Sequence, residues 1–193
     1  ELFHAFPAGL RFESELFYRV DADDDRRTRG DIREAYFHGI GRELELAVGY
    51  RRVFWGVTES RSLVDVINQD DLIEDIGGDD KLGQPMFNLT WISDYGTGNL
   101  YLLAGTRKRT FPGPDGFPRI PFEIDQGASR FDGELGQSRL DLAARWFISG
   151  RGFDLGFSYF DGIARDPNFL PCPRQGSAFP GTENGPNCDL AAA

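Results

Sequence analysis

The side chains that most often carry out enzyme chemistry are scarce in this 193-residue chain. Only two histidines occur, His4 and His38, and neither has a spacing that suggests a Ser-His-Asp or Cys-His arrangement. The G-x-S-x-G and HExxH motifs are absent as well. His38 lies beside a predicted turn, where a hairpin-end residue is the simpler interpretation. We therefore expect a protein that is not an enzyme and needs no cofactor.

Two cysteines, Cys172 and Cys188, enclose a segment rich in glycine and proline. An even count in a surface loop favours a disulfide if the compartment is oxidising. Such a bridge would stabilise the loop by roughly 3 kcal/mol in the chain-entropy description. A metal or redox pair is the less favoured interpretation, because neither a histidine nor a second cysteine pair lies nearby.

Acidic residues gather in two segments, 21–25 and 70–80. The first resembles the opening of a calcium-binding EF-hand loop. However, Arg26 and Ile32 occupy the sixth and twelfth positions, where glycine and glutamate are required. We therefore expect no metal site and interpret both segments as solvated acidic loops.

Composition excludes several classes of protein. The formal net charge of -10 and the pI of about 4.7 disfavour a nucleic-acid partner. No run approaches the roughly 18 apolar residues of a membrane-spanning helix, and mean hydropathy is -0.41. Aromatic residues make up 13%, which disfavours disorder. With 24 glycines and 11 prolines, the composition favours β-structure with frequent turns.

Alternation of apolar and polar residues is the strongest structural signal. Over residues 43–50 every second side chain is apolar: Leu44, Leu46, Val48 and Tyr50. Residues 10–20, 139–148 and 153–159 follow the same rule, with Phe17 as an exception. A period of two is typical of β-strands with one apolar and one polar face.

We predict a strand over residues 1–6 and seven more strands, at 10–21, 31–38, 43–56, 86–94, 98–108, 138–149 and 152–161. Short links (7–9, 39–42, 95–98, 150–151) alternate with long ones (22–30, 57–85, 109–137, 162–193). An antiparallel up-and-down sheet with tight hairpins at one end follows. Within the loop 57–85, Asp70 and Gly77 can cap one or two helical turns.

The apolar faces can be buried in two ways. A soluble sandwich or barrel turns them inward, whereas a transmembrane β-barrel turns them to lipid and keeps the polar faces in a water-filled lumen. We favour the membrane barrel, because the strands are long enough to cross a bilayer and the loops are asymmetric. Six aromatic residues near strand ends could form interfacial girdles: Tyr18, Tyr50, Trp55, Trp91, Trp146 and Tyr159.

A resemblance supports this choice. Residues 53–60 (VFWGVTES), followed by residues 65–71 (DVINQDD), resemble a signature of bacterial outer-membrane porin-like barrels. In these families a strand ends in a W-G-E-S-like turn, and a D-x-I-N-P-x-D segment follows in a long loop. Here Val57 and Thr58 are inserted before Glu59, and Gln69 stands in place of the proline.

The resemblance implies a bacterial outer-membrane location, with short turns on the periplasmic side and long loops outside. Both ends of residues 1–193 are then out of phase with a complete barrel. We therefore expect a single barrel portion with about eight strands, belonging to a larger barrel. Large porins have 16–18 strands.

In a pore, charged side chains on the lumen wall select solutes by charge. We predict that four arginines and four acidic residues line the pore: Arg51, Arg107, Arg139, Arg145, Glu43, Glu45, Glu59 and Asp65. The loop 57–85 is long enough to fold inward and bring Glu59, Asp65 or Asp70 to a constriction. The alternative is that these arginines are merely solvated groups.

Three functions remain open. The first is a porin-like channel for passive diffusion of small hydrophilic solutes, with the outer-membrane bilayer as partner and a homo-oligomer as one option for its assembly. The second is a structural barrel that holds a surface assembly through the loops 109–137 and 162–193, with the segment 111–118 as a stiff contact. The third is a soluble β-domain that binds an apolar ligand inside.

Overall fold

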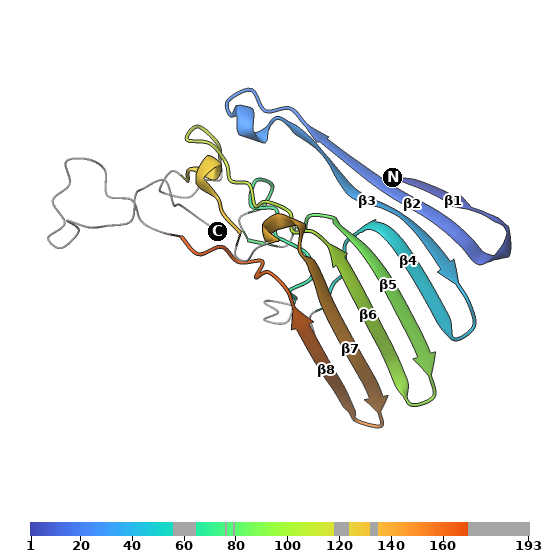
Figure 1. Cartoon of the computed structure of the whole chain (residues 1–193). Coiled ribbons are helices and arrows are strands. Elements are labelled where there is room, and N and C mark those ends of the chain that lie inside the picture. The colour runs from blue at the N-terminus through green and yellow to red at the C-terminus, as the bar shows by residue number, and fades with distance from the viewer. Residues whose placement is uncertain (56–64, 76, 79, 118–123, 132–134, 170–193) are drawn as a thin grey trace, which may run out of the picture.

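The computed structural model describes residues 1–55, 65–75, 77–78, 80–117, 124–131 and 135–169 (Figure 1). These residues form eight strands: β1 (Leu2–Ala5), β2 (Leu10–Arg19), β3 (Arg29–Ile40), β4 (Leu44–Arg51), β5 (Gln84–Ser93), β6 (Gly96–Ala104), β7 (Leu140–Gly150) and β8 (Phe153–Asp161). Four 3₁₀-helices lie between them: η1 (Pro7–Gly9), η2 (Asp25–Arg27), η3 (Gln126–Ala128) and η4 (Gly136–Ser138). No helix in the described part of the chain is long and apolar enough to cross a membrane.

All eight strands belong to one antiparallel sheet, in the order β1-β2-β3-β4-β5-β6-β7-β8. The predicted all-β, up-and-down arrangement is therefore confirmed. The sheet is curved but open: over the described residues β1 and β8 are its two edges, and they do not pair to close a barrel. Short turns lie at one end and the long loops gather at the other, as the alternation of link lengths predicts (Figure 1).

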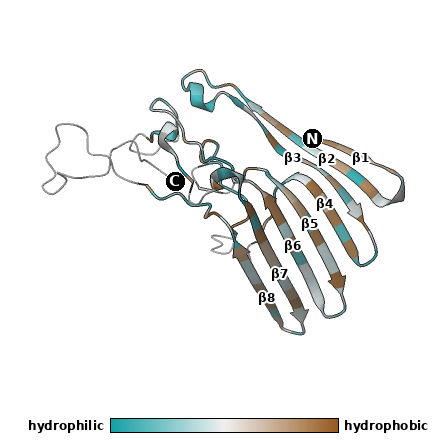
Figure 2. Ribbon diagram, in the orientation of Figure 1, coloured by the Kyte–Doolittle hydropathy of each residue, from teal (hydrophilic) through white to brown (hydrophobic). Residues whose placement is uncertain are grey.

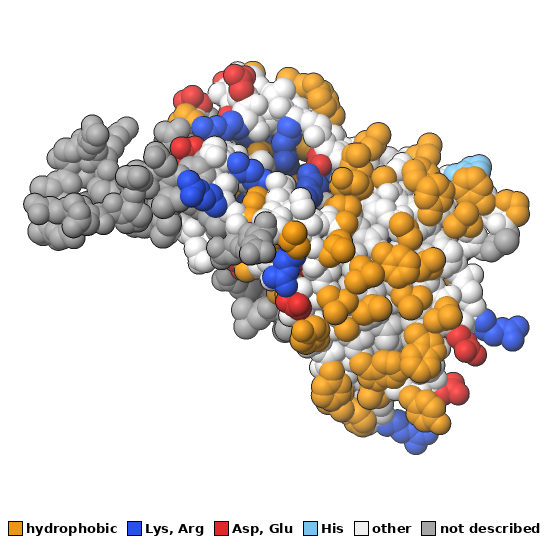
Figure 3. Space-filling view, in the orientation of Figure 1, with side chains coloured by type: hydrophobic (Ala, Val, Ile, Leu, Met, Phe, Trp, Pro, Cys, Tyr) orange, Lys and Arg blue, Asp and Glu red, His pale blue; other side chains and the backbone are white. Residues whose placement is uncertain are grey.

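Apolar and polar residues alternate along the strands (Figure 2), so the two faces of the sheet differ in chemistry. In the register, Leu46 is opposite Leu89, which is opposite Leu100, which is opposite Ala144. These rows extend the apolar face from strand to strand, and most of its large side chains are exposed. Figure 3 shows them as a broad apolar surface over the strands, with charged side chains confined to its two ends.

A bulge in β3 turns an extra charged side chain to the polar face. The register between β2 and β3 shifts after Glu15, which pairs with Glu34, while Leu16 pairs with Ile32. Arg33 is therefore the extra residue, and its guanidinium lies 4.5 Å from the centre of the Phe17 ring. This contact explains why Phe17 departs from the apolar alternation.

β4 ends at Arg51, five residues before the predicted boundary at 56. The next backbone amides are taken by side chains in place of a neighbouring strand. Arg52 N donates to Glu34 Oε1 (3.1 Å), Val53 N to Asn68 Oδ1 (2.8 Å) and Trp55 N to Asp65 Oδ1 (3.1 Å). The chain consequently leaves the sheet and crosses onto the polar face.

The buried core lies between the polar face and this returning loop. Trp55 and Ile67 from the loop pack against four side chains on the polar face of the sheet: Met86, Tyr101, Leu103 and Ala143. Trp55, which is 2% exposed, is therefore a core residue and not part of an interfacial girdle. Its ring contacts Tyr101 edge-on, with centroids 5.8 Å apart.

The other predicted girdle residues stay on the sheet. Tyr18, Tyr50, Trp91 and Tyr159 are exposed by 37% or more. Trp91 and Trp146 pack edge-on at 5.4 Å, near the short-turn end of the apolar face. Within the loop after β4, Asp71 O accepts from Glu74 N (3.1 Å) and Asp75 N (3.0 Å), which forms a single helical turn.

Candidate functional site

The polar face of β4–β7 carries two arginines side by side with amide and aromatic groups. Arg51 Nη1 donates to Asn88 Oδ1 at 2.7 Å, and the Arg51 guanidinium lies 5.1 Å from the centre of the Tyr36 ring. Arg145 Nη1 donates to the backbone oxygen of Trp55 at 3.1 Å. Both guanidinium groups are thus held in place by the sheet and by the loop that covers it.

Asn68 fastens the loop to the end of β4. Its side chain is 1% exposed and makes three hydrogen bonds. Oδ1 accepts from Val53 N, while Nδ2 donates to Arg51 O (2.8 Å) and to Leu82 O (2.9 Å). The side chain thereby replaces strand pairing where the chain turns away from the sheet. The described part of the loop 57–85 folds over the polar face.

Ion pairs join this loop to β2 and β3. Asp71 is fully buried between Arg29 and Arg33, with Arg33 Nη2 2.7 Å from its Oδ2. Arg19 Nη1 lies 2.7 Å from Glu74 Oε2. Arg27 Nη1 donates to Ile73 O at 2.8 Å. The prediction that the acidic segment 70–80 is merely solvated is therefore wrong for Asp71, because the bulged β3 strand supplies it with buried cations.

A second group of charges surrounds Lys81. Its ammonium lies 2.5 Å from Asp70 and 3.4 Å from Asp65. Burial lowers the pKa of Lys81, but the two carboxylates outweigh burial and leave that pKa above its ordinary value. Arg109 lies 3.6 Å from the same Asp70.

A third group of charged side chains lies at the loop end of β7 and β8. Asp141, fully buried on the polar face of β7, lies 3.0 Å from Arg165 Nη1. Burial lowers the pKa of Arg165, and Asp141 opposes that shift. Arg165 also donates to Ile67 O at 3.1 Å, so the segment after β8 is joined to the loop after β4.

The structure brings some of the predicted pore-lining residues together and separates others. Arg51, Glu45 and Arg145 lie on the polar face, and Glu45 Oε2 is 3.3 Å from His38 Nε2. Asp65 lies in the covering loop, where it accepts from Trp55 N. Arg51, Glu45 and Arg145 therefore lie on one polar surface, and Asp65 lies in the loop that covers part of it.

The remaining predicted residues lie elsewhere. Arg107 pairs with Asp31 at 2.7 Å in a hollow that it shares with Tyr50 and Pro85, two residues of the apolar face. Arg139 lies at the loop end and contacts Asp161 at 2.5 Å. Glu43 is exposed beside the short β3–β4 turn. Glu59 and the predicted Cys172–Cys188 pair lie outside the described residues.

Sequence reasoning missed several residues of this network. Arg52 bridges Glu15 (2.6 Å) and Glu34 (3.9 Å), and Tyr36 donates to Glu13 (2.6 Å). These residues alternate with apolar ones, so their face was predictable. Their partners were not, because the pairs join different strands through a register that the sequence alone does not set.

No family model, curated protein or solved structure matches the chain. In the described residues, no group of three or more His, Cys, Asp or Glu side chains could hold a metal ion.

Proposed function

We propose that the eight strands form an arc of the wall of an outer-membrane channel, through which small hydrophilic solutes diffuse. The observation that carries the proposal is the exposed apolar face, whose charged side chains are confined to its two ends (Figure 3). It extends across the sheet, and residues such as Leu46, Leu89, Leu102 and Phe157 occupy it. In water such a surface would associate or aggregate, whereas in a bilayer it is the face that contacts lipid.

Strand length supports the same proposal. β2 to β8 contain 8 to 12 residues each. A tilted strand needs about 9–11 residues to cross the hydrocarbon layer, whereas strands of soluble domains usually have about 5–6. The sheet is therefore about as tall as a bilayer.

The opposite face suits a water-filled path. Arg51, Asn88 and Arg145 are fixed on it, and the loop that begins at Arg52 folds across it. In this proposal the loop narrows the path, and the two arginines give its wall a positive strip. Solutes are then selected by size and charge without a chemical step.

The edges at β1 and β8 must be paired for an arc to persist in a bilayer, because unpaired backbone groups are costly in lipid. We propose that further strands of the same barrel, or a second copy, supply the pairing. A structural barrel that holds a surface assembly is the second candidate. Phe117, which is 87% exposed, would be its contact.

Two adjacent residues of β8 provide a direct test. Phe157 lies on the apolar face and Ser158 on the polar face, and both are exposed. Each is replaced by cysteine in a C172S/C188S background and labelled with an environment-sensitive fluorophore, and the protein is reconstituted into vesicles. We expect brominated lipid to quench the label at 157 and aqueous iodide to quench the label at 158.

Conductance across planar bilayers then separates the two candidates. A channel gives discrete conductance steps, whereas a structural barrel inserts and conducts nothing. Insertion of this face would be refuted if brominated lipid did not quench the label at 157. This holds both for protein that floats with the vesicles and for protein that stays soluble.

A further inference from the structure

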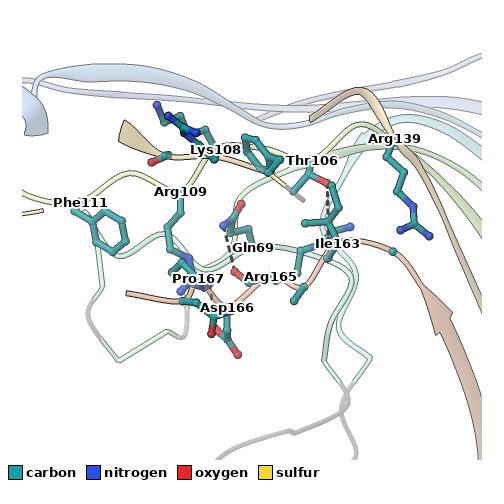
Figure 4. A pocket seen from close by; sticks show the side chains of 16 residues that line it. Gln69, Thr106, Lys108, Arg109, Phe111, Arg139, Ile163, Arg165, Asp166 and Pro167 are labelled. Atoms are coloured by element: carbon teal, nitrogen blue, oxygen red, sulfur yellow. Dashed lines mark hydrogen bonds and ion pairs between the residues drawn. The ribbon is translucent and has the colours of Figure 1, made fainter. Parts of the chain in front are cut away.

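A cavity of about 180 Å³ lies at the loop end of β6, β7 and β8 (Figure 4). The segment after β6, the segments before β7 and the segment after β8 form its walls, and Gln69 from the loop after β4 completes it. Figure 4 shows Arg165 between Gln69 and Thr106, with dashed hydrogen bonds to both, and Arg109 beside Asp166. The cavity is distinct from the polar face around Arg51.

The lining is strongly cationic. Among the described residues that line it, five are basic and one, Asp166, is acidic; the basic residues are Lys108, Arg109, Arg130, Arg139 and Arg165. Lys108 and Arg130 have no ion-pair partner among the described residues. Arg109 has only long contacts, 3.5 Å to Asp166 and 3.6 Å to Asp70. A concave surface with this excess of positive charge attracts anions.

Buried polar atoms around the cavity lack partners. Arg165 is 7% exposed and uses Nε on Ile67 O and Nη1 on Thr106, but its Nη2 has no hydrogen bond among the described residues. Arg109 Nε is likewise unpartnered. Gln69 is 6% exposed and donates to Arg165 O, while its Oε1 accepts nothing from the described residues.

These atoms specify complementary chemistry. Arg165 is paired with Asp141 through Nη1, so the donors left for a ligand are Arg165 Nη2 and Arg109 Nε. An oxyanion can accept from both, and guanidinium groups bind carboxylates well. The free amide oxygen of Gln69 requires a donor such as a hydroxyl. Phe111 and Ile163 give the cavity apolar walls, and the Phe111 ring packs edge-on against Phe169 at 5.7 Å. A carbon skeleton can therefore lie beside the charged end.

We propose that the cavity binds a small hydroxy acid. Its carboxylate contacts Arg109 and Arg165, a hydroxyl donates to Gln69 Oε1, and its carbon chain lies against Phe111 and Ile163. This site goes beyond the proposed channel and does not depend on it, because every residue invoked lies in the loops and not on the apolar face.

The test uses three probes of similar length on the full protein in neutral detergent, with binding measured by titration calorimetry. Gluconate carries both the carboxylate and hydroxyls, hexanoate carries only the carboxylate, and sorbitol carries only hydroxyls. We expect saturable gluconate binding, at least about tenfold weaker hexanoate binding, and no detectable sorbitol binding.

Variants assign the binding to this cavity. We expect R109Q and R130Q each to weaken gluconate by about tenfold, since each removes a cation from the lining. Q69L should reduce gluconate affinity while leaving hexanoate unchanged. R151Q is the matched control, because Arg151 is exposed at the short β7–β8 turn at the other end of the sheet.

Absence of saturable gluconate binding to the unaltered protein would overturn the proposal. Equal weakening by R109Q and R151Q, with circular dichroism showing both folded, would also overturn it. Conductance of the same preparations is recorded separately, so that a channel without this site, or this site without a channel, is recognised.

Discussion

Arg33 and Asp71 form an ion pair in which Arg33 Nη2 lies 2.7 Å from Asp71 Oδ2 and the carboxylate is fully buried. Arg33 is available because the bulge in β3 adds one residue to the strand, and Asp71 is available because the helical turn after Asp70 points it back at the sheet. This ion pair holds the loop after β4 on the polar face of the sheet.

Replacing Asp71 with asparagine should destabilise the protein markedly. Arg29 and Arg33 would lose their shared carboxylate, and removing one partner of a buried ion pair typically costs about 3–5 kcal/mol. Urea unfolding followed by tryptophan fluorescence measures the loss. D115N is the control, because Asp115 is exposed; similar midpoints for D71N and D115N would contradict the packing.

A charge on the apolar face should impair insertion selectively. Leu46 and Glu45 are neighbours on β4 that face opposite sides of the sheet. An arginine on a lipid-facing strand costs about 2–4 kcal/mol near the bilayer midplane. We expect L46R to lower the fraction of the protein that is assembled in vesicles and E45R to leave that fraction nearly unchanged. Protease protection measures this fraction. The reverse order would indicate that the polar face contacts lipid.

If the polar face lines a channel, neutralising its arginines should alter ion selectivity. R51Q removes one positive charge and keeps a donor for Asn88 Oδ1. The anion-to-cation permeability ratio, obtained from reversal potentials in a salt gradient, should fall. Because R42Q changes an exposed arginine at the opposite end of β4, it serves as the comparison. An unchanged ratio in R51Q would remove Arg51 from the conducting path.

The loop between β2 and β3 should respond to acid. The amides of Asp23 and Asp24 donate to the Asp21 carboxylate, and Arg27 Nε lies 3.0 Å from it, so the pKa of Asp21 lies below its ordinary value of about 3.9. A lowered pKa means that the stabilisation is present above pH 3.9 and is lost as pH falls through the folded-state pKa.

Amide hydrogen exchange of residues 23–28 should therefore accelerate in that acidic range, beyond the intrinsic change with pH. In D21N the pH-dependent excess should disappear, because the titrating group is gone. An identical pH dependence in D21N and the unaltered protein would show that Asp21 is not the group responsible.

Asp24 should anchor the segment that contains Phe111 and Phe117. Its buried carboxylate accepts from Gly113 N at 2.7 Å, and a Cβ on Gly116 would lie 2.3 Å from Asp24 Oδ2. Both D24A and G116A should expose the segment 111–117 to limited proteolysis, while circular dichroism should show that the sheet remains folded. D25A offers the comparison, since Asp25 is exposed; equal cleavage in D24A and D25A would contradict the anchor.

The apolar face of each strand can be assigned from the amino-acid sequence alone. Leu44, Leu46, Val48 and Tyr50 alternate with polar or small residues, and a strand sends successive side chains to opposite faces, so the pattern needs no tertiary information. Link lengths similarly predicted the short-turn end and the loop end. The resemblance of residues 53–71 to porin-like signatures remains a prediction.

The partners of the charged side chains could not be assigned without the folded structure. In the sequence nothing distinguishes Asp71 from the other acidic residues of the loop. In the structure it is buried between two arginines of β3. Arg107 and Arg51 both follow the alternation of apolar and polar residues. However, β6 ends before Arg107, next to Gly105 with its positive φ of 71°, whereas Arg51 is still within β4. Side-chain partners depend on strand register and on where a loop returns, and both are set by contacts between residues far apart in the chain.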